Sequence, residues 1–322
     1  MKKTSLKEFK DLQTILPKLK RSPRQLNQVF ESDSEILALS KKTFLAVSTD
    51  GLDEEFESGL YRDPETLGWM SVVMSLSDVA CSGADPLGVV IAVNWKKKMS
   101  SNFQRKFFRG ARDCLNAHRT FLLGGDSGHS SHFSVVSTAM ALGQQPAIQR
   151  SSIKPGDLLV ALSPLGLGAA YAYSFLMKSS AVPEKKLRPV IPFQKIKIVK
   201  KYCHMIIDNS DGIMNTLAIL SDLNGIGFDL QISEKLFHPL AVKFCKTKKI
   251  PVSSLLWAEL GGYEMIASVQ PKHLKKFLQL HPEEKVFAVA IPKKNQKIDL
   301  FYFQKSQLSY LERMKKSIQL CS

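Results

Sequence analysis

The chain has 322 residues, of which 44% are hydrophobic, and a formal net charge of +16. Because this length exceeds the roughly 100 to 200 residues of a typical domain, we expect two domains, each large enough to bury a core. No run of about 18 apolar residues occurs, and the Lys-rich start lacks a signal peptide's apolar segment. We therefore expect a cytoplasmic protein, neither secreted nor membrane-spanning.

Strands and helices are predicted to alternate in residues 1–149, which indicates a mixed α/β domain. Residues 1–40 carry apolar side chains at helical spacing and are expected to add a peripheral helix. β-branched runs predict strands, and Asp63-Pro64 predicts the start of a helix. The expected order is a strand at 44–48, a helix from 63 toward 78, a strand at 87–95, a helix at 102–117, an entry segment at 120–123 and a strand at 134–142.

Residues 150–157 are predicted to join this domain to a second α/β domain that covers residues 150–322. Its helices are expected after Gly166 and after Gly212. Its expected strands are 158–162, 228–232, 264–269 and 286–291. The predicted fold class is therefore α/β (α+β) with two domains.

Four acidic motifs adjoin apolar runs and are predicted to form turns. They are Ser48-Thr49-Asp50, Leu76-Ser77-Asp78, Gly124-Gly125-Asp126 and Asp208-Asn209-Ser210-Asp211-Gly212. Mg²⁺ prefers oxygen ligands, so a polyphosphate site needs several carboxylates with little side-chain bulk around them. One such motif alone is explained as well by a capped turn. The four together predict a site for Mg²⁺ and ATP.

The charge distribution bears on nucleic-acid binding, and the cysteine spacing bears on disulfide formation. The 45 Lys and Arg residues exceed the 29 Asp and Glu residues, but they are spread in short groups without interleaved aromatic residues. This pattern favours a solvated basic surface over nucleic-acid binding. The five cysteines have no CxxC spacing and are expected to be thiols: Cys81, Cys114, Cys203, Cys245 and Cys321. Cys81 follows Asp78 closely enough to lie near the site, although a small buried residue is the simpler interpretation.

The order and spacing of these motifs resemble those of the thiamine-monophosphate kinase family, in the aminoimidazole-ribonucleotide synthetase (PurM-like) superfamily. The likeness runs from about Ser32 to Val269 and includes two longer motifs, Leu76 to Pro86 and Arg150 to Asp157. It implies a two-domain PurM-like fold, with an N-terminal ATP-binding and dimerisation domain. It also implies a homodimer that holds the nucleotide between the N-terminal domains of its two chains.

The resemblance further implies roles for individual residues. The Mg²⁺ ligands, direct or through water, would be Asp33, Ser48, Thr49, Asp50, Asp78, Asp126, Asp208 and Asp211. Residues at the nucleotide would be Gly124, Gly125, Asp126, Arg150 and Ser210, with Arg150 on the phosphates, and Asp126 and Asp211 would be catalytic. Such a set suits phosphoryl transfer, which depends chiefly on positioning and on neutralising charge.

The chain departs from the family pattern, mostly on the acceptor side. The family's Gly-x-Gly-Asp-Asp is Phe30 to Ser34 here, so one of two adjacent carboxylates, Asp33, remains. The family's substrate-binding His falls on Glu57, and its Gly-Gly-Glu-Asp-Tyr-Glu has lost the acidic pair before Tyr263. Glu57 and Tyr263 are thus the expected acceptor-side residues. A carboxylate at position 57 would repel a phosphate acceptor.

The predicted function is ATP- and Mg²⁺-dependent phosphoryl transfer to a small molecule, resembling thiamine-monophosphate kinase, with an acceptor that need not be thiamine monophosphate. Two alternatives stay open. One is ATP-dependent activation of a carbonyl or amide oxygen in a biosynthetic pathway. The other is a nucleotide-binding paralogue without catalytic activity. The sequence does not identify the acceptor.

Overall fold

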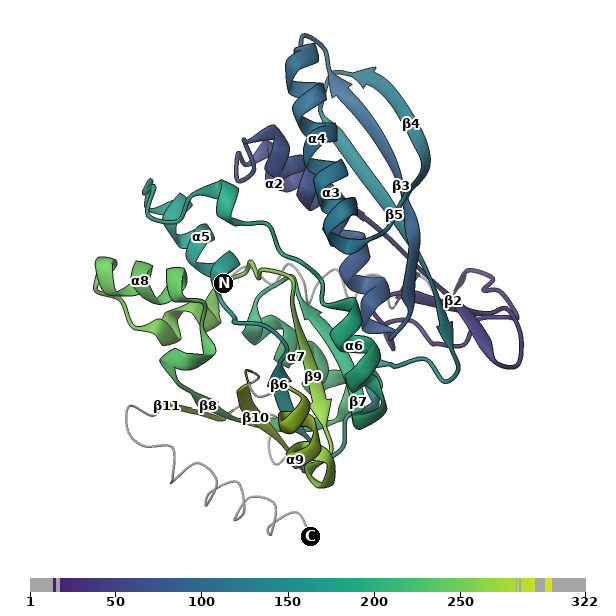
Figure 1. Ribbon diagram of the computed structural model, residues 1–322, viewed down its shortest axis with the longest axis vertical. Coiled ribbons are helices and arrows are strands. Elements are labelled where there is room, and N and C mark those ends of the chain that lie inside the picture. Colours follow the sequence, from purple (N-terminus) through teal and green to yellow (C-terminus); the bar gives the residue numbers. More distant parts are fainter. Residues whose placement is uncertain (1–13, 16–17, 282, 284, 293–298, 303–322) are drawn as a thin grey trace.

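The two halves of the chain form separate sheets. A computed structural model describes residues 14–15, 18–281, 283, 285–292 and 299–302, so part of the helix predicted at 1–40 lies outside the described residues. Within the described part of that segment, residues 18–40 contain no α-helix and residues 35–38 form a strand, so the helix prediction is wrong there. The first sheet has the strand order β1-β2-β5-β3-β4, and the second has the order β11-β8-β10-β6-β9-β7. Figure 1 shows the sheets side by side, each with its own helices. The mixed α/β fold with two sheets is therefore confirmed.

The predicted strands and helices of the first half occur in the predicted order with wider bounds, and three elements at 35–38, 53–57 and 122–130 were not predicted. The strands are β1 Glu35–Ala38, β2 Thr43–Gly51, β3 Asp85–Lys96, β4 Leu122–Ser130 and β5 Ser134–Gln144, and the helices are α2 Asp53–Glu57, α3 Pro64–Cys81 and α4 Ser101–His118. Pro64 is in the first turn of α3, and the Asp63 side chain accepts a hydrogen bond from the Thr66 N–H. These are the start signals that the sequence indicated.

Helix α3 is almost wholly buried because it lies between the sheet and α4 (Figure 1). Two glycines allow the close crossing of the helices. A Cβ at Gly68 would lie 1.9 Å from the Phe107 carbonyl oxygen, and one at Gly110 would lie 1.9 Å from that of Glu65. Both helices cover one face of the sheet, and no helix of the described residues lies against the other face (Figure 1).

The second sheet contains the four expected strands and two strands that were not expected, at 203–209 and 299–302. The strands are β6 Leu158–Ala161, β7 Cys203–Asn209, β8 Ile226–Ile232, β9 Glu264–Val269, β10 Lys285–Pro292 and β11 Asp299–Tyr302. The helices are α5 Leu167–Leu176, α6 Phe193–Val199, α7 Ile213–Asn224, α8 Pro239–Lys248 and α9 Pro271–Leu280. Helices α5 and α7 begin where Gly166 and Gly212 indicated.

Hydrogen bonds connect the two halves. The indole N–H of Trp69 donates to the Pro189 carbonyl at 2.9 Å, and the Glu184 carboxylate accepts from the Asp63 N–H at 2.9 Å. The domain boundary between residues 149 and 150 stays a prediction. These contacts fix the position of one sheet against the other, and with it the shape of the cavity between them.

Three of the four acidic motifs lie in regular elements, so the prediction that all four are turns is wrong. Asp50 is in β2, Asp78 is near the end of α3 and Asp126 is in β4. Only Ser210 to Gly212 forms a bend, between β7 and α7. Asp, Ser and Gly favour turns locally, but strand pairing and the burial of adjacent apolar residues overrode that preference.

Two smaller predictions concern the membrane and the thiols. No helix in the described part of the chain is long and apolar enough to cross a bilayer. Cys81, Cys114, Cys203 and Cys245 are free thiols, as predicted, and Cys321 lies outside the described residues.

Candidate functional site

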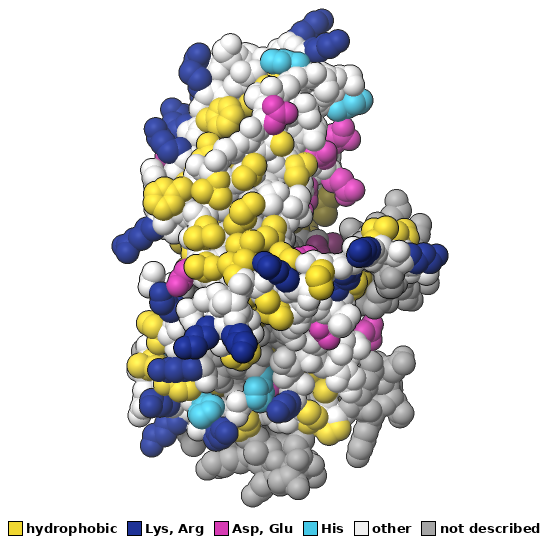
Figure 2. Space-filling view, turned by 90° about the vertical axis from the view of Figure 1, so that its right-hand side faces the viewer, with side chains coloured by type: hydrophobic (Ala, Val, Ile, Leu, Met, Phe, Trp, Pro, Cys, Tyr) yellow, Lys and Arg dark blue, Asp and Glu magenta, His cyan; other side chains and the backbone are white. Residues whose placement is uncertain are grey.

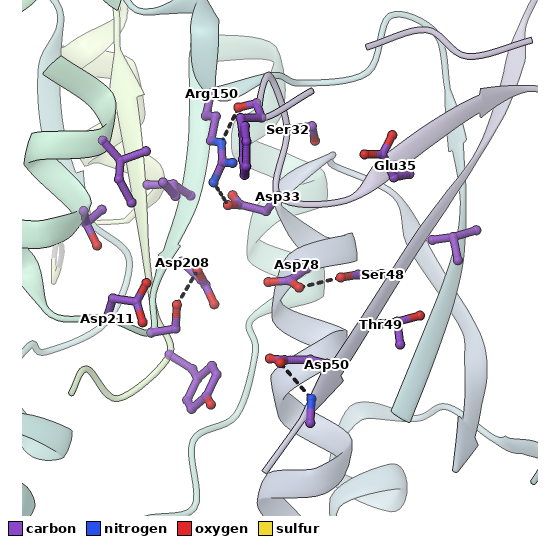
Figure 3. Close-up of a pocket in the computed structure, with 18 of the residues that line it drawn as sticks. Ser32, Asp33, Glu35, Ser48, Thr49, Asp50, Asp78, Arg150, Asp208 and Asp211 are labelled. Atoms are coloured by element: carbon purple, nitrogen blue, oxygen red, sulfur yellow. Dashed lines mark hydrogen bonds and ion pairs between the residues drawn. The ribbon is translucent and has the colours of Figure 1, made fainter. Parts of the chain in front are cut away.

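A cavity of about 700 Å³ opens between the two sheets, and we call it the central cavity. Its volume is within the range of small-molecule sites, roughly 300 to 1,000 Å³. Both halves of the chain contribute oxygen-bearing side chains to its wall: Asp33, Ser48, Asp50, Asp78, Asp208 and Asp211. Figure 3 shows their carboxylates gathered from separate segments around one space. The predicted metal ligands are therefore largely brought together.

The N-terminal side of the cavity is built by β2 and α3. Side chains alternate between the faces of a strand, so Ser48 and Asp50 lie on one face of β2. The Ser48 hydroxyl donates to Asp78 Oδ2 at 2.5 Å, which places that face toward α3 (Figure 3). A strand and a buried helix thus present three oxygen side chains without a turn.

The C-terminal side is built by the end of β7 and the bend after it. The Ser210 hydroxyl donates to Asp208 Oδ1 at 3.4 Å, and the Gly261 N–H donates to the Ser210 carbonyl at 2.6 Å. A Cβ at Gly261 would lie 1.8 Å from the Asn209 carbonyl oxygen. The glycine pair before Tyr263 is therefore needed for close packing against the acidic segment.

Crowding of carboxylates perturbs their protonation. Burial and the charges of Asp208, Asp33 and Asp50 raise the pKa of Asp78 well above its usual value. Burial, and next the charge of Asp33, raise the pKa of Asp208 to about 8. A divalent cation would offset this repulsion, and carboxylate and hydroxyl oxygens are the ligands that Mg²⁺ prefers. The donor set therefore fits Mg²⁺.

The raised pKa of Asp208 predicts how the stability of the metal-free protein depends on pH. Between the unfolded value of about 3.9 and the folded value, the folded state binds a proton that the unfolded state lacks. The free energy of unfolding should therefore fall as pH rises through this window, and Asp208→Asn should make the fall smaller. Urea denaturation with a chelator, at about pH 6 and about pH 8, measures this fall in the free energy of unfolding for the wild type and for the variant. An unchanged slope in the variant would contradict this assignment.

Arg150 holds Asp33 in place. Its Nε donates to the Phe30 carbonyl at 2.6 Å, and its Nη1 pairs with Asp33 Oδ1. The Arg150 and Asp33 side chains are 11% and 8% exposed, so this is a buried ion pair at the cavity wall (Figure 3). A contact between Arg150 and ATP phosphates stays a prediction.

Four predicted residues are not directed into this carboxylate group. Thr49 is part of the cavity wall, but its hydroxyl hydrogen-bonds with Thr138 Oγ1 at 2.9 Å, on the face of β2 opposite to Ser48 and Asp50. Gly124, Gly125 and Asp126 are exposed on the edge strand β4, outside the cavity wall. In the register of the sheet, Asp126 on β4 is opposite Ala92 on β3, Ala92 is opposite Val136 on β5, and Val136 is opposite Gly51 on β2. Asp126 is therefore three strand spacings, about 14 Å, from β2 and its carboxylate-bearing face.

The two predicted acceptor-side residues are also separated. Glu57 is 61% exposed at the end of α2, with its carboxylate 3.7 Å from His132 Nδ1, and is not part of the cavity wall. Tyr263 lines the cavity, is buried, and has φ +55°. A left-handed backbone is uncommon for a bulky residue, and such strain often accompanies a functional site.

Sequence reasoning missed Glu55, Glu259 and the role of Glu264. Glu55 and Glu259 line the cavity, and burial raises the pKa of Glu55. The Glu264 carboxylate accepts hydrogen bonds at 2.8 Å from the Gly166 N–H, the Gly262 N–H and the Asn209 amide. It therefore fastens the glycine pair to the acidic segment. Its place directly after Tyr263, as in the family motif, was the available signal.

Sequence comparisons agree with the resemblance to the thiamine-monophosphate kinase family. Residues 31–144 match the family described as AIR synthase related protein, N-terminal domain. The chain is 27% identical over 302 residues to a thiamine-monophosphate kinase of Buchnera aphidicola, covering 84% of this chain and 86% of that protein. It is 24% identical over 253 residues to the Aquifex aeolicus enzyme of the same name, covering 75% and 80%.

Solved structures share the fold. AaThiL complexed with AMPPCP and TMP superposes with a TM-score of 0.73 at 19% identity, over 87% of this chain and 90% of that one. Hydrogenase maturation protein HypE in complex with ATP superposes with a TM-score of 0.65 at 12% identity, over 87% of each chain. At these identities the structural likeness supports the fold alone.

Proposed function

Since the chain is a thiamine-monophosphate kinase-like protein of the PurM-like superfamily, we propose that it is an ATP-dependent phosphotransferase that uses Mg²⁺ in the central cavity. The observation that carries this proposal is the convergence of Asp33, Asp50, Asp78 and Asp208 on one cavity. A covalent nucleophile is not needed, because phosphoryl transfer depends on positioning and charge neutralisation.

The described side chains would have separate roles in metal binding, positioning and acceptor contact. Asp50, Asp78, Asp208 and Asp211 would hold Mg²⁺, which when bound neutralises phosphate charge and orients the phosphoryl group. Ser48 fixes the Asp78 carboxylate by its hydrogen bond. Glu264 and Gly261 fix the loop that carries Tyr263, which we propose to face the acceptor.

We further propose that the protein is a homodimer joined through the open face of the first sheet. Figure 2 shows hydrophobic side chains in a band across the molecule. Exposed apolar residues of β3, β4 and β5 and of the segment before β4 are Leu87, Phe121, Leu122, Leu123, Val136 and Leu142. An exposed apolar patch of this kind indicates a protein interface. A self-complementary face pairs naturally about a two-fold axis.

This dimer would give Asp126 a role that it lacks within its own chain. Its strand register places it on the open face, level with Ala92 and Val136. We propose that Asp126, with Gly124 and Gly125, reaches the nucleotide in the partner's cavity. Gly124 leaves the β4 backbone open to close approach, since a Cβ there would meet nothing within 4 Å, whereas a Cβ at Gly125 would lie 1.9 Å from the Ile91 carbonyl oxygen within the sheet.

The acceptor is proposed to be a small molecule, and charge is the first property that an acceptor screen should vary. Glu55 and Glu259 line the cavity. These carboxylates favour an acceptor with less negative charge than a phosphate monoester. An acceptor screen should therefore include uncharged and cationic alcohols beside thiamine monophosphate. We propose a cytoplasmic location, which the four free thiols suit.

Calorimetric titration with a non-hydrolysable ATP analogue tests the nucleotide site. We expect one analogue to bind per chain with Mg²⁺, and binding to weaken by about tenfold or more without it, because the phosphates would then face unshielded carboxylates. Asp113→Asn, in α4 and outside the cavity wall, is the matched control and should bind as the wild type does. Absence of binding by a folded sample would refute the kinase proposal and favour the inactive paralogue.

A further inference from the structure

Cys81 lies beside the central cavity at the end of α3, and the proposed function does not use it. Its Sγ atom, a carboxylate oxygen of Asp33 and a carboxylate oxygen of Asp208 all lie within 4.8 Å of one another. Among the described residues, no other three His, Cys, Asp or Glu side chains come together in this way. The three come from separate segments: the loop before β1, the end of α3 and the end of β7.

All three side chains are withdrawn from solvent. Cys81 is 2% exposed and Asp208 is 4% exposed. Within the described residues, Asp33 Oδ2 and Asp208 Oδ2 are buried without a hydrogen-bond partner. A buried carboxylate oxygen without a partner is unfavourable, so two such atoms facing one space indicate a ligand site.

The other oxygen of each carboxylate is already held. Arg150 pairs with Asp33 Oδ1, and the Ser210 hydroxyl donates to Asp208 Oδ1. These contacts orient each carboxylate and leave its Oδ2 atom available. Outer hydrogen-bond partners commonly orient metal ligands in this way. Figure 3 shows the Asp33 and Asp208 carboxylates directed toward the same space.

The sulfur atom decides the class of ion. Mg²⁺ prefers six oxygen ligands, whereas thiolate is a soft ligand that favours ions such as Zn²⁺. Ligand atoms about 2.0 to 2.3 Å from a tetrahedral zinc lie roughly 3.5 Å apart, so small movements of these side chains would close the triad. Binding would exchange the thiol proton, released to solvent, for a sulfur–metal bond.

We propose that Asp33, Cys81 and Asp208 form a site for a thiophilic divalent cation such as Zn²⁺ at the edge of the central cavity. Cys81 would then determine which metal this position prefers. The proposal includes Asp208, which the proposed function assigns to Mg²⁺, but binding of the metal alone does not depend on that function. The two can therefore fail separately.

Titration of the full-length protein with Co²⁺, without nucleotide or Mg²⁺, tests the site. We expect one ion to bind per chain with thiolate-to-cobalt charge-transfer absorption, and Zn²⁺ to displace it. Cys81→Ser should abolish that absorption and weaken binding by roughly tenfold or more, since even outer partners of metal ligands contribute about 10- to 100-fold. Cys114→Ser, at a buried cysteine within α4, is the matched control and should retain both signals.

Either of two results would overturn the proposal: no thiolate absorption in the wild type, or equal absorption and affinity in folded Cys81→Ser. Thermal unfolding checks the fold, and Cys81→Ala is the second variant. If neither variant folds, Asp208→Asn keeps the thiol and must still weaken Co²⁺ binding by a similar factor. Loss of Mg-nucleotide binding with an intact Co²⁺ site would contradict only the proposed function.

Discussion

Asp78→Asn is expected to lower kcat/KM by about 100-fold or more while raising the stability of the metal-free protein. The substitution keeps the size of the side chain and an oxygen that can accept from Ser48, but removes a negative charge. That charge is repelled by Asp208, Asp33 and Asp50, which contribute, after burial, to the raised pKa of Asp78. The same repulsion makes the group a strong partner for a divalent cation, so function and stability change in opposite directions.

Two measurements separate these effects. Thermal unfolding with a chelator should show a higher Tm for Asp78→Asn, by about 2 to 4 °C for each kcal/mol gained. Added Mg²⁺ and nucleotide should stabilise the wild type by mass action and the variant much less. Asp113→Asn is the control for the loss of a surface charge. A variant with wild-type turnover would show that Asp78 is not a metal ligand.

The strands and helices near the site were largely predictable, because each has a strong local signal. Phe44 to Ser48 is a largely apolar run, and Asp63-Pro64 begins α3 as an N-cap and first turn. Burial of the apolar neighbours then extended β2 through Asp50 and α3 past Asp78. No local sequence pattern distinguishes an acidic motif in a turn from one that continues a strand or a helix.

The site was predictable as a set of residues and only partly as a geometry. Motif order indicated the carboxylates that line the cavity. It did not indicate that Thr49 points to the other face of β2, or that Asp126 lies three strands away, because both depend on strand register. Glu57 was expected beside the acceptor but lies exposed at the end of α2. Cys81 received a structural interpretation because its closeness to Asp33 and Asp208 arises only in the folded chain.

Mixing two inactive variants, Asp78→Asn and Asp126→Asn, is expected to restore activity if Asp126 serves the partner's cavity. In a mixed dimer one cavity would carry both substitutions and the other neither. Random exchange of equal amounts makes half of the dimers mixed, so about a quarter of wild-type activity should return. Each variant alone should stay about 100-fold or more below the wild type, because each loses a carboxylate at the phosphates. Turnover measured after unfolding and refolding the mixture gives the recovered fraction.

The exposed apolar face supplies the control for this experiment. Leu123 is 50% exposed on β4, so Leu123→Glu should place a charge in the proposed interface with little effect on the folded monomer. Introduced into both variants, it should give monomers by light scattering and no recovery on mixing. Recovery absent from mixed dimers that demonstrably form would place Asp126 in its own chain's chemistry. An active Asp126→Asn variant would show that Asp126 has no catalytic role. Recovery on mixing, or its absence, therefore discriminates between a site shared by two chains and a site within one chain.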